Sequence, residues 1–264
     1  MEENRYIEKE RLSISEIYGE SFRIFGENWL TYLIAAITIG VVVGAISCLG
    51  LIFDGSKLYS LLTTIINVIV GAAITTLYIG TAYNSMRQDQ KNIGALISEK
   101  VFPIALTQLL LYLLLLIPGF VVMFGAIQLM MYSGSGSSVV AVTILIFIIA
   151  IPVALKMAFL LHGIVLSDQH YLAAIKWSFS KTKGEAFRII GINIAPVIIA
   201  VIAHVLNANG FWFSGIGALI SLVVLGFIGT IVGVIVVIAI TVLYIDAVME
   251  EDETHPEAVT FTIG

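Results

Sequence analysis

The chain has 264 residues, of which 59% are hydrophobic and only 12% are charged, and its mean hydropathy is +1.04. Soluble domains carry roughly 25% charged residues, so this composition argues against a water-exposed globular fold and favours one embedded in lipid. The net charge of −5 gives no electrostatic support for nucleic-acid binding, and the single cysteine, Cys48, excludes a disulfide within the chain.

Six apolar stretches are long enough to cross a bilayer, which takes about 20 mostly apolar residues. They are Trp29–Phe53, Leu58–Tyr83, Phe102–Tyr132, Val139–Leu166, Ala186–Leu206 and Gly217–Val248. Pro118 and Gly119 predict a kink or break in the third stretch. The segment Phe211–Gly217 is either interfacial or part of the last span. The pattern predicts an all-α integral membrane protein with six transmembrane helices.

The basic residues gather on one side of the predicted spans. Eleven of the thirteen Lys and Arg residues lie before the first span, in the second-to-third loop, or in the fourth-to-fifth loop and the first turn of the span that follows it. Lys57 falls in an opposite loop, and Lys156 lies inside the fourth span. Because Lys and Arg are enriched in cytoplasmic loops, we expect both termini to be cytoplasmic and the chain to be integral to the plasma membrane.

The chain also contains an internal repeat. The segment Gly19–Gly26 matches Gly184–Gly191 at six of eight positions, and Ile74–Ile79 resembles Ile240–Ile245 at nearly the same offset. These collinear matches predict three parallel units, each an approach helix plus two spans, related by an axis along the membrane normal. The units cover residues 13–83, 90–166 and 168–249, between a polar N-terminal arm (residues 1–12) and an acidic C-terminal tail (residues 250–264).

The approach segments have the pattern of amphipathic helices. Ser13 and Glu16 fit a capping box at the start of the first one. Apolar residues then recur at helical spacing on one face, which predicts a helix that lies at the membrane interface. These residues are Ile14, Ile17, Tyr18, Phe22 and Phe25. In the third unit, Asp168 is predicted to cap the corresponding helix, and Gly184 is predicted to end it before the fifth span.

The third unit resembles a known family. The run from Leu166 to Gly184, followed by Phe187–Gly191, is similar to the A-hydrophobic-K-x-S … K-G … R-hydrophobic-x-G pattern of the glycerophosphoryl diester phosphodiesterase membrane domain and its stand-alone six-span relatives. Leu243–Asp246 resembles the end of that domain's last span, so the similarity covers most of the chain. The resemblance implies a helical membrane domain. It does not imply an enzyme, because these 264 residues leave no room for the soluble phosphodiesterase barrel that gives the family its name.

Five polar residues in or beside the predicted spans are candidates for an intramembrane site. They are Lys156, Asp246, Asn67, Gln108 and Asn193. An ionisable residue inside a membrane is a functional hypothesis by default, and Asp246 is the carboxylate predicted to reach Lys156 from the sixth span. The alternatives are a lysine that snorkels to the interface and amides that only join helices by hydrogen bonds.

A basic cluster is a candidate site for lipid headgroups. It comprises Lys176, Lys181, Lys183 and Arg188. Attraction to anionic headgroups contributes about 1 kcal/mol per basic residue near the surface. The chain has no phosphate-binding loop and no hydrolase or metalloprotease motif, so we expect no catalytic residues, no cofactor and no metal.

Two functions fit these features. The first is a non-catalytic multi-pass protein that associates with lipids or acts as a scaffold, with membrane lipids as partners and a further membrane-protein partner open. The second is a transporter or channel for a small solute or lipid, with a polar path between the repeats near Lys156, Asn67 and Gln108. A transporter should line a continuous polar cavity, whereas a scaffold should pack its polar groups in pairs.

Overall fold

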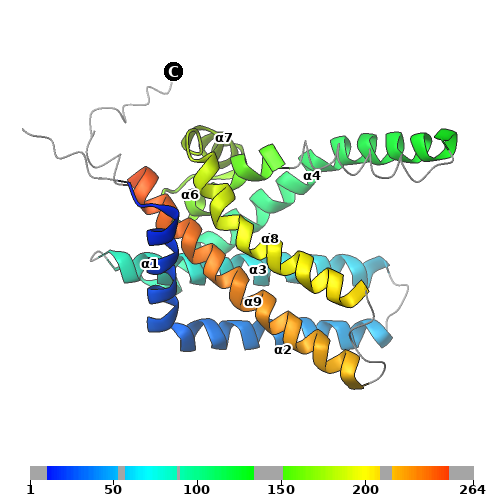
Figure 1. Cartoon of the computed structure of the whole chain (residues 1–264), viewed down its shortest axis with the longest axis horizontal. Coiled ribbons are helices and arrows are strands. Elements are labelled where there is room, and N and C mark those ends of the chain that lie inside the picture. The colour runs from blue at the N-terminus through cyan, green and yellow to red at the C-terminus, as the bar shows by residue number, and fades with distance from the viewer. Residues whose placement is uncertain (1–10, 53–56, 88–89, 134–150, 209–215, 250–264) are drawn as a thin grey trace, which may run out of the picture.

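The computed structural model describes residues 11–52, 57–87, 90–133, 151–208 and 216–249 (Figure 1). These residues are helical nearly throughout, and no strand occurs among them. The elements are α1 (Ile14–Glu27), α2 (Trp29–Ile52), α3 (Lys57–Met86), α4 (Ile93–Ser133), α6 (Leu160–Leu166), α7 (Tyr171–Lys181), α8 (Ala186–Ala208), α9 (Ile216–Tyr244) and the π-helical turn η1 (Ile245–Met249). The prediction of an all-α fold is confirmed for this part of the chain.

Four described segments are long and apolar enough to cross a membrane. They are Trp29–Ile46, Lys57–Met86, Ile93–Leu114 and Phe227–Met249. Two further apolar helical segments, Ile151–Leu166 and Ala186–Ile198, are shorter. The long helices expose large apolar side chains, including Val41, Leu58 and Phe102, each about two-thirds exposed. An apolar surface of this extent needs lipid or a partner to cover it, which agrees with a membrane protein.

Most predicted span boundaries fall close to helix ends. α2 and α8 begin at the predicted residues, Trp29 and Ala186, and α3 and α9 begin one residue before the predicted ones. Residues 139–150 of the fourth predicted span lie outside the described residues, as does most of the segment Phe211–Gly217. The boundaries agree because a change from polar to apolar composition marks where a membrane helix can start.

The third predicted span differs most from the structure. α4 is one helix of 41 residues that begins at Ile93, before the predicted Phe102, and continues through Pro118. Of the two predicted alternatives at Pro118, the break is wrong, because a single proline removes one hydrogen bond while the turns on either side keep theirs, and the kink stays a prediction. At 1.5 Å per residue the helix is about 60 Å long, roughly twice the hydrocarbon thickness of a bilayer. Its second half extends beyond the other helices in Figure 1.

The start of α1 agrees with its sequence pattern. Ser13 is the N-cap, and its hydroxyl accepts a hydrogen bond from the Glu16 amide at 3.3 Å. The Glu16 carboxylate accepts one from the Ser13 amide at 2.7 Å. The predicted capping box is confirmed, and these bonds satisfy two amides that would otherwise lack acceptors at the helix start. The Ser13 hydroxyl also donates to the Glu16 carboxylate at 2.7 Å, and this bond, together with the one from the Ser13 amide, holds the pKa of Glu16 below its ordinary value.

The buried face of α1 covers only part of the predicted apolar face. Ile17, Ser21 and Ile24 are fully buried, where α1 packs against α8 and α9. Phe22, on the predicted apolar face, is 57% exposed, so only part of that face is buried within the described chain. The small Ser21 takes the central position because its hydroxyl is satisfied by the Ile17 carbonyl at 2.6 Å, which allows close approach of the neighbouring helices.

The helix that follows Asp168 starts later than predicted. The N-cap of α7 is His170, whose side chain makes no capping bond, and Asp168 pairs instead with Lys100. The prediction that Asp168 caps this helix was therefore wrong, because an ammonium group is a stronger partner for a carboxylate than a backbone amide. Asp168 and Tyr171 both have φ of 53°, and Gly184, with φ of 94°, lies in the turn between α7 and α8.

α3 and α9 lie side by side at the centre of the described chain, and α1, α4, α6 and α8 pack on one or the other of them (Figure 1). The buried side chains concentrate at one end of these two helices, in Ala72–Tyr83 and Val234–Val248. We call this end, with α1, α6 and α7, the packed end. Farther from it, large apolar side chains such as Leu58 and Phe227 are exposed.

One of the two repeat matches joins equivalent places in the fold. Ile74–Ile79 and Ile240–Ile245 both lie at the packed end of the central helices. Their tyrosines, Tyr78 and Tyr244, are both buried. Both segments therefore supply closely packed side chains at this end.

The other repeat match falls in different elements. Gly19–Gly26 lies inside α1, whereas Gly184–Gly191 covers the turn after α7 and the start of α8. The following amides behave alike, since Asn28 and Asn193 each donate to the carbonyl four residues earlier, at 3.0 and 2.8 Å. The helix nevertheless ends before Asn28 and continues through Asn193. The three-unit arrangement therefore stays a prediction.

Candidate functional site

A network of charged side chains closes the packed end. Arg188 donates through Nη1 to Glu185 Oε2 at 2.9 Å, and its Nη2 pairs with Asp246. The same Nη2 donates to the Leu12 carbonyl at 2.8 Å, and Arg11 Nη1 lies 2.5 Å from the other oxygen of Glu185. The Glu185, Asp246 and Arg188 side chains are 3%, 6% and 16% exposed. We call Arg11, Glu185, Arg188 and Asp246 the Arg188 network.

Three distant parts of the chain meet in this network. Glu185 directly precedes α8, so Arg188, three residues later, points to the same side of the helix. Asp246 lies on the π-helical turn η1, and its second oxygen accepts from the Leu12 amide at 3.3 Å. The network therefore fixes the start of α1, the start of α8 and the end of α9 against one another.

Two predicted roles are replaced by these contacts. Asp246 was predicted to pair with Lys156, but one of its oxygens accepts from Arg188 and the other accepts from the Leu12 amide. Arg188 was predicted to bind lipid headgroups, but it binds acceptors inside the protein. A guanidinium group can bond several acceptors at once, which makes arginine the better partner where two carboxylates converge. Lys156 is half-buried, and its carbonyl accepts from Ser178 Oγ at 2.7 Å.

An aromatic group fills the space beside the network. The His162 and Tyr244 rings stack with their centroids 5.5 Å apart, and Trp177 contacts Tyr244 at 5.7 Å. His162 Nε2 lies 3.1 Å from Thr241 Oγ1. Gly163 allows α6 to approach the indole, since a Cβ there would lie 2.6 Å from Trp177. These contacts join α6, α7 and α9 into one core.

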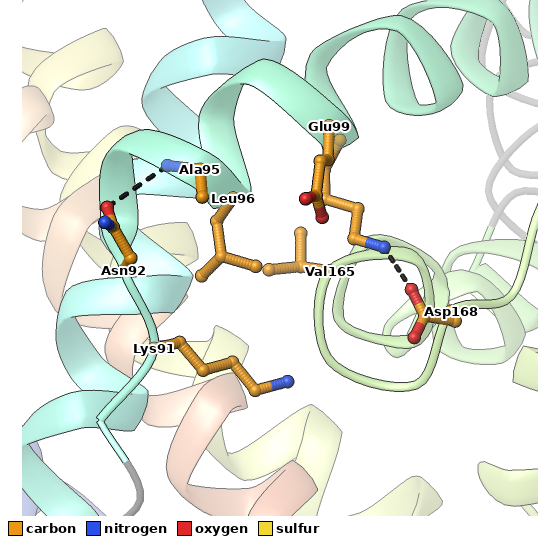
Figure 2. A pocket seen from close by; sticks show the side chains of 8 residues that line it. Lys91, Asn92, Ala95, Leu96, Glu99, Val165 and Asp168 are labelled. Atoms are coloured by element: carbon orange, nitrogen blue, oxygen red, sulfur yellow. Dashed lines mark hydrogen bonds and ion pairs between the residues drawn. The ribbon is translucent and has the colours of Figure 1, made fainter.

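A second charged site is a pocket of about 270 Å³ between the start of α4 and the end of α6 (Figure 2). Its lining residues are Lys91, Asn92, Ala95, Leu96, Glu99, Lys100, Val165 and Asp168. Leu96 and Val165 are buried and form an apolar floor. Figure 2 shows Lys91 and Glu99 on opposite sides of the pocket with this floor between them. We call it the Lys91 pocket.

Lys91 is held firmly in place. Asn84 binds both backbone groups of Lys91, since its Nδ2 donates to the Lys91 carbonyl and its Oδ1 accepts from the Lys91 amide, each at 2.8 Å. Lys91 Nζ donates to the Leu166 carbonyl at 3.3 Å and lies 5.1 Å from the centroid of the Tyr83 ring. The turn between α3 and α4 thus presents the Lys91 ammonium group in a defined position.

The two carboxylates of the pocket differ in whether they have a partner. Lys100 is only 8% exposed and pairs with Asp168, whose side chain is 78% exposed. The hydrogen bond from Lys100 holds the pKa of Asp168 below its ordinary value, and the charges of Lys91 and His170 act in the same direction. In the part of the chain that the structure describes, Glu99 has no hydrogen-bonded or ion-paired side-chain partner, and its carboxylate faces the pocket (Figure 2).

The predicted intramembrane candidates do not form a common site. Asn67 is exposed on α3, Gln108 is half-buried on α4, and Asn193 donates within its own helix. Among the described residues, no hydrogen bond joins any two of Lys156, Asn67, Gln108 and Asn193. The structure therefore gives no contact that links them into a polar path.

The remaining basic candidates lie on or just after α7. Lys176 and Lys183 are exposed, and Lys181 is half-buried. Exposed lysines beside a membrane suit the predicted headgroup contact, which stays a prediction for these three. Arg188, the fourth predicted residue, binds acceptors inside the protein instead.

Sequence reasoning missed Glu185 and the Lys91 pocket, although the repeat held a signal for Glu185. In the repeated motif a Glu and an Arg stand three residues apart, and both copies form that ion pair, Glu20 with Arg23 and Glu185 with Arg188. The first pair is solvent-exposed and the second is buried. Only the packing of distant helices separates the two, and composition does not reveal it.

Neither a metal site nor a known relative points to an activity. Among the residues that the structure describes, no three His, Cys, Asp or Glu side chains gather as metal ligands would. No family model, curated protein or solved structure matches the chain. The resemblance to the phosphodiesterase membrane domain therefore stays a prediction from the residues quoted above.

Proposed function

We propose that this chain is a non-catalytic, multi-pass protein of the plasma membrane that associates with lipids and acts as a scaffold. In this proposal six spans form three parallel units, and both termini are cytoplasmic. The proposal includes the resemblance to the membrane domain of glycerophosphoryl diester phosphodiesterases. It does not include phosphodiesterase activity, which in that family belongs to a separate barrel.

The observation that carries the proposal is the separation of polar and apolar groups. Charged side chains pair with one another at the packed end, as in the Arg188 network and the Lys100–Asp168 pair. Large apolar side chains cover the outside of the long helices, as at Val41 and Phe102. A scaffold in lipid needs both features, because it must hold its helices together and present an apolar surface to acyl chains.

A transporter is the alternative, and the described contacts favour it less. A transport path would need neighbouring polar side chains along the helices. Lys156, Asn67 and Gln108 share no hydrogen bond in the described part of the chain, and Asn67 is exposed on the outside of α3. Isolated amides of this kind are common in membrane helices without transport.

The membrane arrangement is tested with reporter fusions. A green fluorescent protein fused after Gly264 should fluoresce, and alkaline phosphatase fused there should be inactive. Phosphatase inserted between residues 209 and 215 should be active, because that segment precedes the last span and lies on the opposite side in the six-span arrangement. An active phosphatase after Gly264 would contradict that arrangement.

The scaffold role is tested against transport in liposomes. Proteoliposomes that contain the purified chain should shrink and swell at the rate of empty liposomes when challenged with glycerol, potassium chloride or an amino acid. Faster flux that Lys156→Met abolishes would favour the transporter and overturn the scaffold. Unchanged flux, with the fusion results above, would support the scaffold.

A further inference from the structure

Only two of the four charged side chains in the Lys91 pocket pair with each other. It contains two ammonium groups, from Lys91 and Lys100, and two carboxylates, from Glu99 and Asp168. Lys100 and Asp168 pair with each other. Lys91 and Glu99 face each other across the apolar floor (Figure 2), and among the described residues neither has an ion-pair partner. The pocket therefore presents one cationic and one anionic end.

Such a pair selects against ligands with a single charge. A purely anionic group bound near Lys91 would also meet the Glu99 carboxylate, and a purely cationic group bound near Glu99 would meet Lys91. A ligand with an anion at one end and a cation at the other satisfies both. Its middle should be apolar, because Leu96 and Val165 line the floor and are nearly fully buried.

The hydrogen-bond donors and acceptors of the pocket limit further which ligands fit it. An ammonium group has three donors, and Lys91 uses one on the Leu166 carbonyl, at 3.3 Å. The others can reach a phosphate oxygen. Glu99 is an acceptor only, so the cation it prefers carries N–H donors. A primary amine meets this requirement, whereas a quaternary ammonium does not.

The position of the pocket fits a headgroup. Its residues lie at the start of the membrane-length segment Ile93–Leu114. Phe102, two residues after Lys100, is 69% exposed, so an apolar, lipid-compatible surface begins beside the pocket. A volume of about 270 Å³ is at the small end of ligand sites and suits a headgroup better than a whole lipid.

We propose that the Lys91 pocket binds a phosphoethanolamine diester, with its phosphate on Lys91 and its primary amine on Glu99. The ethylene group between them lies over Leu96 and Val165, and the Lys100–Asp168 pair forms a fixed wall. Asn84 prepares the site in advance, since it holds both backbone groups of Lys91. The inference rests on the proposed membrane function and names the lipid headgroup that the chain would select.

Binding is measured with the full chain purified in dodecyl maltoside. Native mass spectrometry compares dioleoyl lipids that carry ethanolamine, choline or glycerol on the phosphate. We expect the ethanolamine lipid to bind about tenfold more tightly than the other two, because one charge-assisted hydrogen bond separates them. Titration calorimetry with glycerophosphoethanolamine, which has no acyl chains, separates a lipid ligand from a free solute. Tight binding of the free diester identifies a soluble ligand of the same chemistry.

Two variants and two matched controls locate the effect. Glu99→Gln should equalise the ethanolamine and choline lipids, because the amide keeps the shape and loses the charge. Lys91→Met should weaken binding of all three lipids. Glu27→Gln and Lys57→Met change exposed residues away from the pocket and should leave the lipid preference unaltered. Melting temperatures of the variants show whether each one is folded.

The outcomes separate this inference from the proposed function. Equal binding of the three lipids by the folded wild-type chain, or an ethanolamine preference that persists in Glu99→Gln, overturns the headgroup site. The reporter fusions can still support the six-span scaffold in that case. Fusions that contradict membrane insertion overturn the scaffold, whereas a soluble diester that binds through Lys91 and Glu99 would still support the pocket.

Discussion

The Arg188 network and the Lys91 pocket are built from the same kinds of side chain, and they differ in how fully those side chains are used. In the network every carboxylate is bonded, and Glu185 and Asp246 are almost completely buried. In the pocket one pair is closed, and the Glu99 carboxylate faces an open space (Figure 2). The network joins α1, α8 and α9, whereas the pocket lies between α4 and α6.

This difference suits the network to holding helices in place and the pocket to binding a ligand. A buried charge that loses its partner is costly, so a closed network fixes the positions of the helices that contribute to it. A partly exposed charge can exchange water for a ligand at little cost. Charged residues of a membrane protein therefore have to be compared by their partners and their burial, since both sites contain two basic and two acidic residues.

Removal of Arg188 should have the largest effect on the free energy of unfolding, because it breaks the Arg188 network. Arg188→Met leaves Glu185 and Asp246 buried without their shared partner, which should lower the free energy of unfolding by about 3–5 kcal/mol. Arg11→Met is the matched control, because Arg11 is 58% exposed and its removal should cost at most about 1 kcal/mol. Denaturation of the purified chain in mixed micelles measures both. Equal losses would show that the network is not a buried unit.

A double-mutant cycle assigns the partner of Asp246. Arg188→Met and Asp246→Asn should couple strongly, because each removes the other's partner, whereas Lys156→Met and Asp246→Asn should be additive within about 0.5 kcal/mol. Coupling between Lys156 and Asp246 would restore the pairing predicted from the sequence and contradict the contacts of Asp246 in the structure.

A glycine at the packed end should show the next largest effect. Gly163→Ala places a Cβ within 2.6 Å of the Trp177 ring, and overpacking of this kind costs about 1–3 kcal/mol. Gly40→Ala in α2 is the control, because no atom outside its own helix backbone lies within 4 Å of the added Cβ. That change should be neutral or slightly stabilising, since alanine favours helix more than glycine does. Melting temperatures in detergent give both values, and a tolerated Gly163→Ala would contradict close packing of α6 on α7.

The starts of several helices could be predicted because they depend on local composition. The starts of α2 and α8 need only a run of apolar residues after a polar segment, and the capping box of α1 needs only Ser13 and Glu16 at the right spacing. The course of α4 through Pro118 was left open between a kink and a break, because a proline signals a bend and does not decide whether the helix continues.

The charged sites could not be predicted because they depend on distant contacts. Arg188 and Asp246 are 58 residues apart, and Lys100 and Asp168 are 68 apart. From the sequence alone, Arg188 is equivalent to the neighbouring lysines, and only the approach of η1 to α8 gives it a buried partner. Asp168 has the sequence position of a helix cap, and the approach of α4 brings Lys100 to it instead. Hydrophobic pattern fixes which segments are helices and leaves their register against one another undetermined.

The smallest expected effect is the pH dependence of the Lys100–Asp168 pair. Lys100 holds the pKa of Asp168 below its ordinary value, so the pair stabilises the fold above the pKa of the unfolded carboxyl, about 3.9. That contribution is lost as the pH falls through the lower, folded pKa. Because the Asp168 side chain is 78% exposed, solvent screening keeps the contribution small. The melting temperature of Asp168→Asn should lie slightly below that of the wild type at pH 6, and the difference should shrink as the pH approaches 3. A difference that grows on acidification would contradict stabilisation of the fold by the charged form of Asp168, and with it the Lys100–Asp168 pair as a wall of the pocket.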